Sequence, residues 1–448
     1  MPLTPSPSTG LIPALPAEDA APSNPQRGSW RMRLAGPFTD PVLRILSAYA
    51  LVSTLGRGVF FTLTVLYFTL IVGLSTAEVA IVLTVASAVG VLTGLLGGQL
   101  ADRISSRRLL FAIVVLEGVA LIAYAQATSF GLVLLIACIV TGADRAANST
   151  RAAIIARAFT GGARVDARAI LRTITNVGIA LGSALASVPL LIGTGDAFRL
   201  AIVLAGTATL ASTLVVWRLP RRVNAPARAT TRTGPSPAPG GRPPFRNPRY
   251  LALTALSGLF GIQFGLAEIG LPLWVVNFTE APTVMVSVLL IVNTTLVIAF
   301  QIPLSRGTHD VRRAGNAVGL AGLLMLVACL AYAGSGAVPV VAAVALLVVA
   351  MLLHTFAEVL SSAGTWGLSF ELAEPDRAGA YQGVFSMGFS LGAMVAPLVI
   401  TATVLTHGPV GWALLAALFA GSAAGIMVIA RRDTDTMAPD LSASLKKT

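Results

Sequence analysis

The sequence predicts an all-α integral membrane protein with twelve transmembrane helices arranged as two bundles of six. Three observations support this prediction: the composition, the number of long apolar runs and a basic, proline-rich stretch at mid-chain. Of the 448 residues, 55% are hydrophobic and only 11% are charged, whereas about a quarter of the residues in soluble domains are charged. A chain this apolar is expected in a lipid bilayer.

Apolar runs of sufficient length define the expected helices, because roughly 20 helical residues cross the hydrocarbon core. We expect transmembrane helices at residues 45–72, 78–101, 108–128, 131–157, 169–193, 197–218, 250–276, 283–304, 313–334, 338–366, 378–405 and 409–430. The first and the tenth run are longer than the bilayer requires, which indicates tilt or helix that extends beyond the membrane.

Segments of low complexity divide the chain. The N-terminal segment is rich in Pro, Ser and Ala and lacks a short apolar stretch with a cleavage site, which predicts a disordered tail and an uncleaved first helix. The central segment combines arginines with prolines and is expected to be a linker. The expected parts are an N-terminal tail (1–40), a first bundle (41–218), a basic linker (219–248), a second bundle (249–430) and a C-terminal tail (431–448).

Arginines fall on alternate connections between the predicted helices. Pairs occur at Arg107–Arg108, Arg312–Arg313 and Arg431–Arg432, whereas the opposite connections hold almost none, with Arg199 as the clear exception. The positive-inside rule therefore places both termini in the cytoplasm, in a multi-pass protein of the plasma membrane. An even number of spans agrees with this orientation.

Scarce residue types exclude several kinds of chemistry. The net charge of +12 would suggest a nucleic-acid partner in a soluble chain, but here the arginines lie between apolar runs and none is expected. The two lysines, Lys446 and Lys447, stand at the C-terminal end, so no P-loop or Schiff-base lysine is available. Three isolated histidines and two isolated cysteines predict no metal site and no cofactor. No nucleophile–base cluster indicates an enzyme.

The two halves resemble each other weakly, since Tyr67 aligns with Trp274 and Val79 with Val286. With six helices in each half, both halves start on the same side of the membrane, which makes the repeat parallel. A substrate site is then expected between the halves near mid-membrane.

The segment Gly97–Arg108 resembles the signature loop of the major facilitator superfamily, which joins helices 2 and 3. The matching residues are Gly98, Leu100, Ala101, Asp102, Arg103 and Arg107. Ser105 and Ser106 depart from the pattern, where a glycine and a basic residue are usual. The resemblance implies the major facilitator fold and secondary transport by alternating access.

The resemblance also implies that Gly98, Asp102, Arg103 and Arg107 act as a conformational gate. In the family this loop locks the outward-facing state, and its Asp meets the start of helix 11, here near residues 374–377. An Asp at a helix N-terminus is stabilised by the helix dipole. The alternative is that these charges only anchor a short turn among the lipid headgroups.

A second resemblance is to the proton-coupled multidrug efflux members of this superfamily. Residues 267–272 resemble their helix 7 and place Glu268; residues 354–359 resemble their helix 10 and place Glu358. Their helix 5 motif is degenerate here, since Gly178 and Gly182 remain but Ser183 replaces a proline. This resemblance implies proton-driven export of a small hydrophobic or amphiphilic compound by antiport.

Ionisable residues within the predicted spans are few, because each one is unfavourable by at least about 2.5–3.5 kcal/mol. They are Arg57, Glu117, Asp144, Arg145, Arg151, Glu268, His354 and Glu358. We expect Glu268 and Glu358 to couple to protons or substrate, since removal from water favours the neutral form of a carboxylic acid. His354 and Glu358 are four residues apart and are expected to share a helix face. The alternative is a satisfied packing pair.

The remaining charged residues are expected to be polar groups of the cavity. Asp144, Asn148 and Arg151 form a stripe on one helix face, with Arg145 beside it. This stripe either faces the cavity or joins its helix to a neighbour as an internal ion pair. Arg57 either binds an anionic group or pairs with Glu117 for structure alone.

Six aromatic residues lie on the predicted first and seventh helices. Phe60, Phe61, Tyr67, Phe260, Phe264 and Trp274 could form an aromatic wall for an amphiphilic substrate, or they could pack against lipid and other helices. Tyr67 and Trp274 lie near helix ends, where interfacial aromatic belts occur.

The sequence therefore predicts a secondary transporter that works as a monomer in a lipid bilayer. Its expected partners are a small-molecule substrate and protons. The alternative to export is proton-coupled uptake of a small metabolite, which the same architecture supports.

Overall fold

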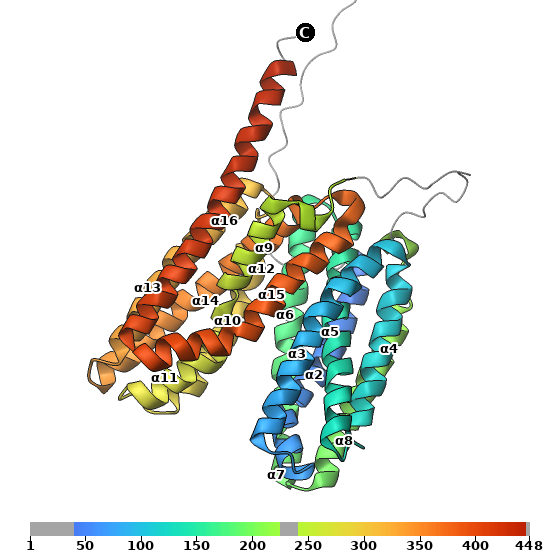
Figure 1. Ribbon diagram of the computed structural model, residues 1–448, viewed down its shortest axis with the longest axis vertical. Coiled ribbons are helices and arrows are strands. Elements are labelled where there is room, and N and C mark those ends of the chain that lie inside the picture. Colours follow the sequence, from blue (N-terminus) through green and yellow to red (C-terminus); the bar gives the residue numbers. More distant parts are fainter. Residues whose placement is uncertain (1–39, 225–240, 445–448) are drawn as a thin grey trace, which may run out of the picture.

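A computed structural model describes residues 40–224 and 241–444, and every regular element in these ranges is a helix (Figure 1). The predicted all-α class is confirmed. The expected N-terminal tail up to residue 39, residues 225–240 of the linker and residues 445–448 lie outside the described residues.

The N-terminal half consists of six spans. They are α2 (Pro41–Leu66) with the π-helical η2 (Tyr67–Ile71), α3 (Thr76–Arg103), α4 (Ser106–Tyr124), α5 (Phe130–Ala158), α6 (Gly161–Leu185) with α7 (Ser187–Ile192), and α8 (Gly195–Val216). A short 3₁₀ turn, η3 (Arg221–Val223), follows them.

The C-terminal half also consists of six spans. The turn η4 (Pro244–Arg246) leads into an irregular span of α9 (Pro248–Phe260), α10 (Ile262–Gly265), the π-helical η5 (Leu266–Gly270) and α11 (Leu271–Phe278). The others are α12 (Met285–Ser305), α13 (Val311–Ser335), α14 (Val340–Glu371), α15 (Ala378–Ile400) with η7 (Thr401–Leu405), and α16 (Pro409–Ser444). The turn η6 (Pro375–Arg377) precedes α15.

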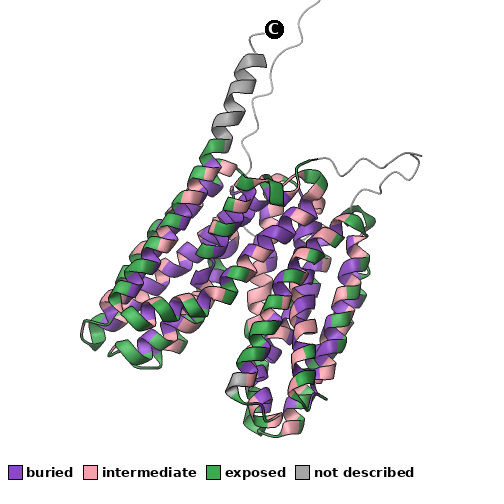
Figure 2. Ribbon diagram, in the orientation of Figure 1, coloured by how far each residue is buried: buried purple, intermediate pink, exposed green. Residues whose placement is uncertain are grey.

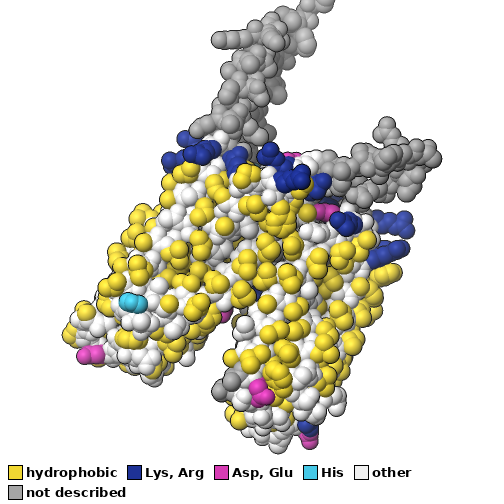
Figure 3. All heavy atoms as spheres, viewed as in Figure 1, with side chains coloured by type: hydrophobic (Ala, Val, Ile, Leu, Met, Phe, Trp, Pro, Cys, Tyr) yellow, Lys and Arg dark blue, Asp and Glu magenta, His cyan; other side chains and the backbone are white. Residues whose placement is uncertain are grey.

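Eleven helices of the described chain are long and apolar enough to cross a membrane. The twelfth span is α4, which has 19 residues and carries Arg107, Arg108 and Glu117. Exposed residues on the outer sides of both bundles are largely apolar (Figures 2 and 3). Twelve spans with an apolar surface describe a multi-pass membrane protein.

The two halves meet at one end and separate at the other (Figure 1). Arginines gather at the end where the halves meet, and the molecule is hollowed between the halves at the opposite end (Figure 3). We call these the basic end and the open end. Contacts between the halves come from α15 against α3 and α5, and from α6 against α12 and α14.

Local sequence signals explain where several helices begin. Asp40 accepts a hydrogen bond from the backbone N–H of Val42 and Pro41 starts α2, a combination that favours a helix N-terminus. Ser75 and Glu78 form a reciprocal capping box at the start of α3.

Tyr67 and Trp274 occupy equivalent positions in the two halves. The Tyr67 hydroxyl donates to the carbonyl of Tyr124 at the end of α4, and Trp274 Nε1 donates to the carbonyl of Tyr332 near the end of α13. Both rings are buried. Neither ring therefore belongs to an interfacial belt; each fixes its helix to the third span of its own half.

Two predicted helix boundaries are wrong. The fifth span begins at Gly161 rather than at residue 169, so Arg164 and Arg168 lie in α6 and not in a loop. The last helix continues to Ser444, beyond the predicted end at residue 430. In both cases helix extends past the apolar run, and hydropathy alone does not report helix outside the hydrocarbon.

Candidate functional site

Two facing rows of side chains line the contact between α6 and α14. Arginines on α6 recur every four residues at 164, 168 and 172, and α14 presents residues 358, 362, 366 and 370 at the same spacing. Residues four apart lie on one helix face. The two faces therefore run along each other and join the N-terminal half to the C-terminal half.

The innermost contact is the ion pair between Arg172 and Glu358. Arg172 donates to Glu358 Oε1 at 2.6 Å and to Ser362 Oγ at 2.6 Å. Asn293 of α12 donates to the second carboxylate oxygen at 3.0 Å. Glu358 is only 7% exposed, so its carboxylate is held almost entirely by protein groups, and one of them belongs to the other half.

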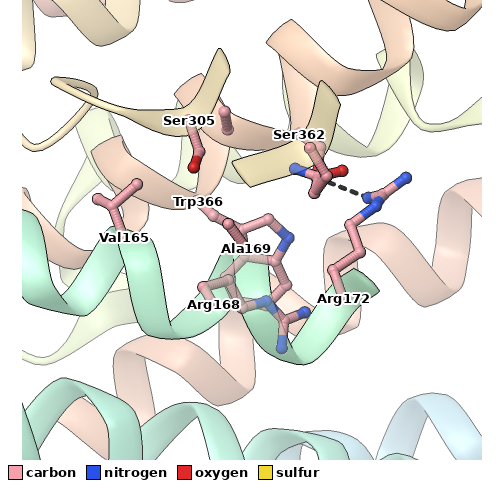
Figure 4. A pocket seen from close by; sticks show the side chains of 9 residues that line it. Val165, Arg168, Ala169, Arg172, Ser305, Ser362 and Trp366 are labelled. Carbon is pink, nitrogen blue, oxygen red and sulfur yellow. Dashed lines mark hydrogen bonds between the residues drawn. The ribbon is translucent and has the colours of Figure 1, made fainter. Parts of the chain in front are cut away.

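Arg168 lies next on the row and contacts an aromatic ring. Its guanidinium carbon is 3.6 Å from the centroid of Trp366 (Figure 4). This is close cation–π geometry. Arg168, Arg172, Ser305 and Trp366 border a small space between the halves (Figure 4).

Arg164 makes the outermost contact of the row. It pairs with Glu371 Oε1 at 3.3 Å, and its guanidinium lies 5.7 Å from the Phe370 ring. Both charged side chains are partly exposed. This pair lies at the rim of the basic end.

Glu268 lies in the π-helical segment η5, where the span of α9–α11 is irregular. Its side chain is exposed, and it is close enough to Glu358 for a direct electrostatic interaction. Gly265 precedes the irregular segment, Gly270 ends it and Pro272 follows it. Such residues are tolerated in spans that line a cavity.

His354 and Glu358 do not bond to each other in the described chain. The hydroxyl of Tyr332 is 3.4 Å from His354 Nδ1, whereas Glu358 bonds to Arg172 and Asn293. His354 Nε2 is buried without a hydrogen-bond partner among the described residues. The two residues lie four apart in α14, but their polar contacts differ: His354 contacts Tyr332 of α13, and Glu358 bonds between the halves.

Asp102 bonds across the halves at the basic end. Its carboxylate accepts hydrogen bonds from the backbone N–H groups of Gly379 at 2.8 Å and Ala380 at 2.6 Å, at the start of α15. It also pairs with Arg157 of α5. A carboxylate at a helix N-terminus is favoured by the free N–H groups and by the helix dipole.

Gly98 allows the two helices to come together beside Asp102. A Cβ added at Gly98 would overlap the carbonyl oxygen of Gly379 and would approach the Cα of Gly383 to 2.7 Å. Small residues at both positions therefore permit backbone contact between α3 and α15.

The two arginines of the signature loop do not take part in this contact. Arg103 is exposed. Arg107 lies 5.0 Å from the Trp217 ring and donates to the carbonyl of Leu219 at 3.4 Å. Both of these partners belong to the N-terminal half, so Arg107 holds the loop to the end of α8 within one half.

A second charged network lies entirely within the N-terminal half. Arg57 of α2 pairs with Asp144 of α5 and lies 3.9 Å from Glu117 of α4. Arg151 contacts the Tyr49 ring at 5.5 Å. Arg57 thus contacts Glu117, as one of the two alternatives expected, and its shorter contact is with Asp144 of the same half.

Arg145 lies beside this network. Its aliphatic stem packs close to Gly90 and Gly94 of α3. Within the parts of the chain that the structure describes, no group of three or more His, Cys, Asp or Glu side chains could hold a metal ion.

The sequence matches the Major Facilitator Superfamily over residues 46–397. The chain belongs to this superfamily. It is a membrane transporter that binds a small-molecule substrate within the bilayer, and the expected membership is confirmed. A comparison with curated proteins gives no significant match.

Solved structures of superfamily transporters share the fold. The human organic anion transporter MFSD10 (TETRAN) is 17% identical, with a TM-score of 0.66 over 86% of this chain and 99% of that one. The proton:xylose symporter XylE is 13% identical, with a TM-score of 0.65 over 86% of this chain and 94% of that one. A bacterial homologue of the iron transporter ferroportin, in an outward-facing state, is 12% identical, with a TM-score of 0.66 over 88% and 99%.

Most of the six aromatic residues that were expected to form a wall for the substrate are buried in the core. Tyr67, Trp274, Phe60 and Phe260 are buried. Phe61 is 61% exposed. Phe264 alone of the six lies at the site, 5.2 Å from the guanidinium of Arg172.

Arg172 and Arg157, which pair with Glu358 and Asp102, were not predicted as their partners. Arg172 falls inside a predicted span and, like the other charged residues there, is unfavourable in lipid. Its spacing from Arg164 and Arg168 was a signal that could have found it. For Arg157, the position at the end of α5 gave no such signal.

Proposed function

We propose that this protein is a proton-coupled secondary transporter that exports a small hydrophobic or amphiphilic compound across the plasma membrane. It works by alternating access, with both termini in the cytoplasm. The observation that carries the proposal is the ion pair between Arg172 and Glu358, which joins the two halves next to the basic end.

The orientation follows from the arginines. Positively charged residues gather at the end where the halves meet (Figure 3), and the positive-inside rule assigns such an end to the cytoplasm. The open end then faces outward. This conformation is the outward-facing one, and the contacts of Asp102 and Gly98 act as the gate that closes the cytoplasmic side.

A proton on Glu358 would weaken this closure. The ionised carboxylate attracts Arg172 across the halves, and a protonated carboxyl loses that attraction. The pair is buried, so its electrostatic contribution is large compared with that of an exposed pair. Protons that enter from the open end therefore favour separation of the halves at the basic end.

Glu268 supplies the route for the proton. It is exposed on the irregular segment η5 and interacts electrostatically with Glu358. Glu268 would take up the proton from the open end and Glu358 would respond to it. His354 contacts Tyr332 of α13 and does not bond to Glu358, so it does not belong to this proton route.

The test uses everted membrane vesicles with an acid interior and three related probes: naphthalene-1-sulfonate, naphthalene-1-sulfonamide and trimethyl(1-naphthyl)ammonium. Export by antiport predicts that at least one probe accumulates inside while protons leave. Glu358→Gln and Glu268→Gln should abolish the dependence on the pH gradient. Glu371→Gln, which removes a carboxylate from the same helix α14 at the rim, is the matched control and should keep it.

Proton-coupled uptake of a small metabolite is the second candidate. The degenerate helix 5 motif favours it, because Ser183, Ala186 and Ser187 replace the proline and glycines typical of antiporters. Uptake predicts that an acid vesicle interior drives probe and protons outward together. If no probe responds to the gradient in either direction, or if both glutamine variants respond normally, proton coupling at these carboxylates is wrong.

A further inference from the structure

We propose that the exported compound carries an anionic group, which binds between the two halves at Arg168, beside Gln301 and Trp366. This inference rests on the export cycle proposed above and names the class of its substrate. The site is the small space bordered by α6, α12 and α14 (Figure 4).

Arg168 is a cation without an acidic partner in the described chain. Its neighbour on α6, Arg172, pairs with Glu358, and Arg164 pairs with Glu371. Arg168 instead contacts the Trp366 ring, and Arg151 and Arg172 are close enough to repel it. Arg168 is partly buried. A partly buried cation among other cations is a favourable place for an anion and an unfavourable one for a cation.

Polar groups beside Arg168 are also left without partners. Gln301 of α12 is 2% exposed, and its Oε1 has no hydrogen-bond partner among the described residues. Nε of Arg172 also has no hydrogen-bond partner among the described residues. Buried polar groups without partners are unfavourable. An oxyanion that enters this space could accept hydrogen bonds from the Arg168 guanidinium and from Nε of Arg172. Because Oε1 of Gln301 is itself an acceptor, Gln301 binds the oxyanion only through its NH₂ group.

Aromatic rings next to the space suit an apolar body. Trp366 stacks on Phe389 with an interplanar angle of 8° and a centroid distance of 6.0 Å. Phe264 and Phe389 line an adjoining space that shares Ser362 with the first. An anionic group at Arg168 would place an attached ring against these residues.

The conformation determines when this site is available. Its walls come from both halves, α6 on one side and α12 and α14 on the other, and in the outward-facing state there is room for little more than a water molecule. Separation of the halves at the basic end would open the space toward the cytoplasm, and closure would expel the ligand. Such a site loads inside and unloads outside, as export requires.

The experiment measures equilibrium binding to the full-length protein in nanodiscs, without a pH gradient. Naphthalene-1-sulfonate should bind saturably and at least about ten-fold more tightly than trimethyl(1-naphthyl)ammonium, and Arg168→Gln should weaken its binding by about ten-fold or more. Arg312→Gln removes the same charge from an exposed position at the same end and should leave the affinity unchanged. Glu358→Gln should tighten binding, because it favours separation of the halves.

Three results would overturn the anion site: no saturable binding of the sulfonate, equal loss in Arg168→Gln and Arg312→Gln, or tighter binding of the ammonium probe. None of them depends on proton coupling. Failure of the proposed function shows instead in the vesicles, as probe movement that ignores the pH gradient. Arg168→Lys is the second variant; partial rescue of binding supports an anion contact over a structural role.

Discussion

Arginines of the N-terminal half form ion pairs of two kinds. Arg57 pairs with Asp144 and approaches Glu117, and all three belong to one bundle. Arg172 pairs with Glu358, which belongs to the other bundle. The chemistry is the same and both sets are largely buried. What differs is whether the partners move together.

This difference assigns different tasks to the same kind of contact. Partners within one bundle keep their distance when the halves rock, so their pairing contributes to folding in every state. Partners on opposite bundles are separated when the basic end opens, so their pairing contributes only to the state in which the basic end is closed. Changes in the first set should therefore alter stability, and changes in the second should alter the conformational equilibrium.

The largest expected effect comes from preventing contact between the halves. Gly98→Leu places a side chain where the backbone of α15 now lies, so the basic end cannot close and transport should fall by about 100-fold or more. Gly421→Leu is the matched control, because a Cβ at Gly421 meets nothing within 4 Å. The measurement is the transport rate of both variants compared with that of the wild type. Near-normal transport by Gly98→Leu would mean that α3 and α15 need not approach this closely.

The next effect is on stability and comes from the network within one half. Asp144→Asn removes the main partner of Arg57, and breaking a buried ion pair is unfavourable by about 3–5 kcal/mol. Thermal unfolding in detergent should show a clear loss of stability. The triple change Arg57→Met with Asp144→Leu and Glu117→Gln should recover most of it, since it removes Arg57 together with both carboxylates that it contacts.

Glu358→Gln is the corresponding change in the ion pair between the bundles, and it is measured in the same way. Glu358→Gln should lower the free energy of unfolding by less than Asp144→Asn does, because separation of the halves can return the unpaired Arg172 to water, whereas Arg57 stays enclosed in one bundle. A loss as large as that of Asp144→Asn would show that both pairs are structural. The distinction between pairs within and between bundles would then be wrong.

Hydropathy and arginine placement predicted the fold well because the bilayer imposes both. Every span in lipid must satisfy its own backbone, which makes the helices readable as apolar runs. The boundary of α6 was missed because Arg164 and Arg168 interrupt the apolar run while the helix continues. Because of that error Arg164 and Arg168 were assigned to a loop, and the row of three arginines on α6 was not recognised.

The candidate site was only partly predictable for a similar reason. Glu358 and Asp102 stand out in the sequence, the first because a charge in a span is unusual and the second because it lies in a signature loop. Their partners depend on which helices pack together, as Arg172 and Arg157 show. Single-sequence patterns report the face of a helix but do not report what lies opposite that face.

A smaller effect is expected at the signature loop. Asp102→Asn removes the charge that faces the N-terminus of α15 and leaves one carbonyl oxygen, which can accept from only one of the two N–H groups that now bond to separate carboxylate oxygens. Interaction of a carboxylate with a helix N-terminus contributes up to about 2 kcal/mol, so the outward-facing state should lose about ten-fold in population. Labelling of a cysteine introduced at Ser362 of α14, which is buried and bonds to Arg172 of the other half, would report the shift. Unchanged labelling would assign Asp102 to anchoring the turn.

The smallest effect is expected for the ion pair at the rim. Arg164 and Glu371 pair across the halves, as Arg172 and Glu358 do, but both side chains are partly exposed. Exposed pairs contribute about 0–1 kcal/mol and weaken as salt rises. Glu371→Gln should therefore reduce transport by less than about five-fold, and less still at high ionic strength. A loss equal to that of Glu358→Gln would mean that crossing between the halves, rather than burial, determines the contribution of a pair.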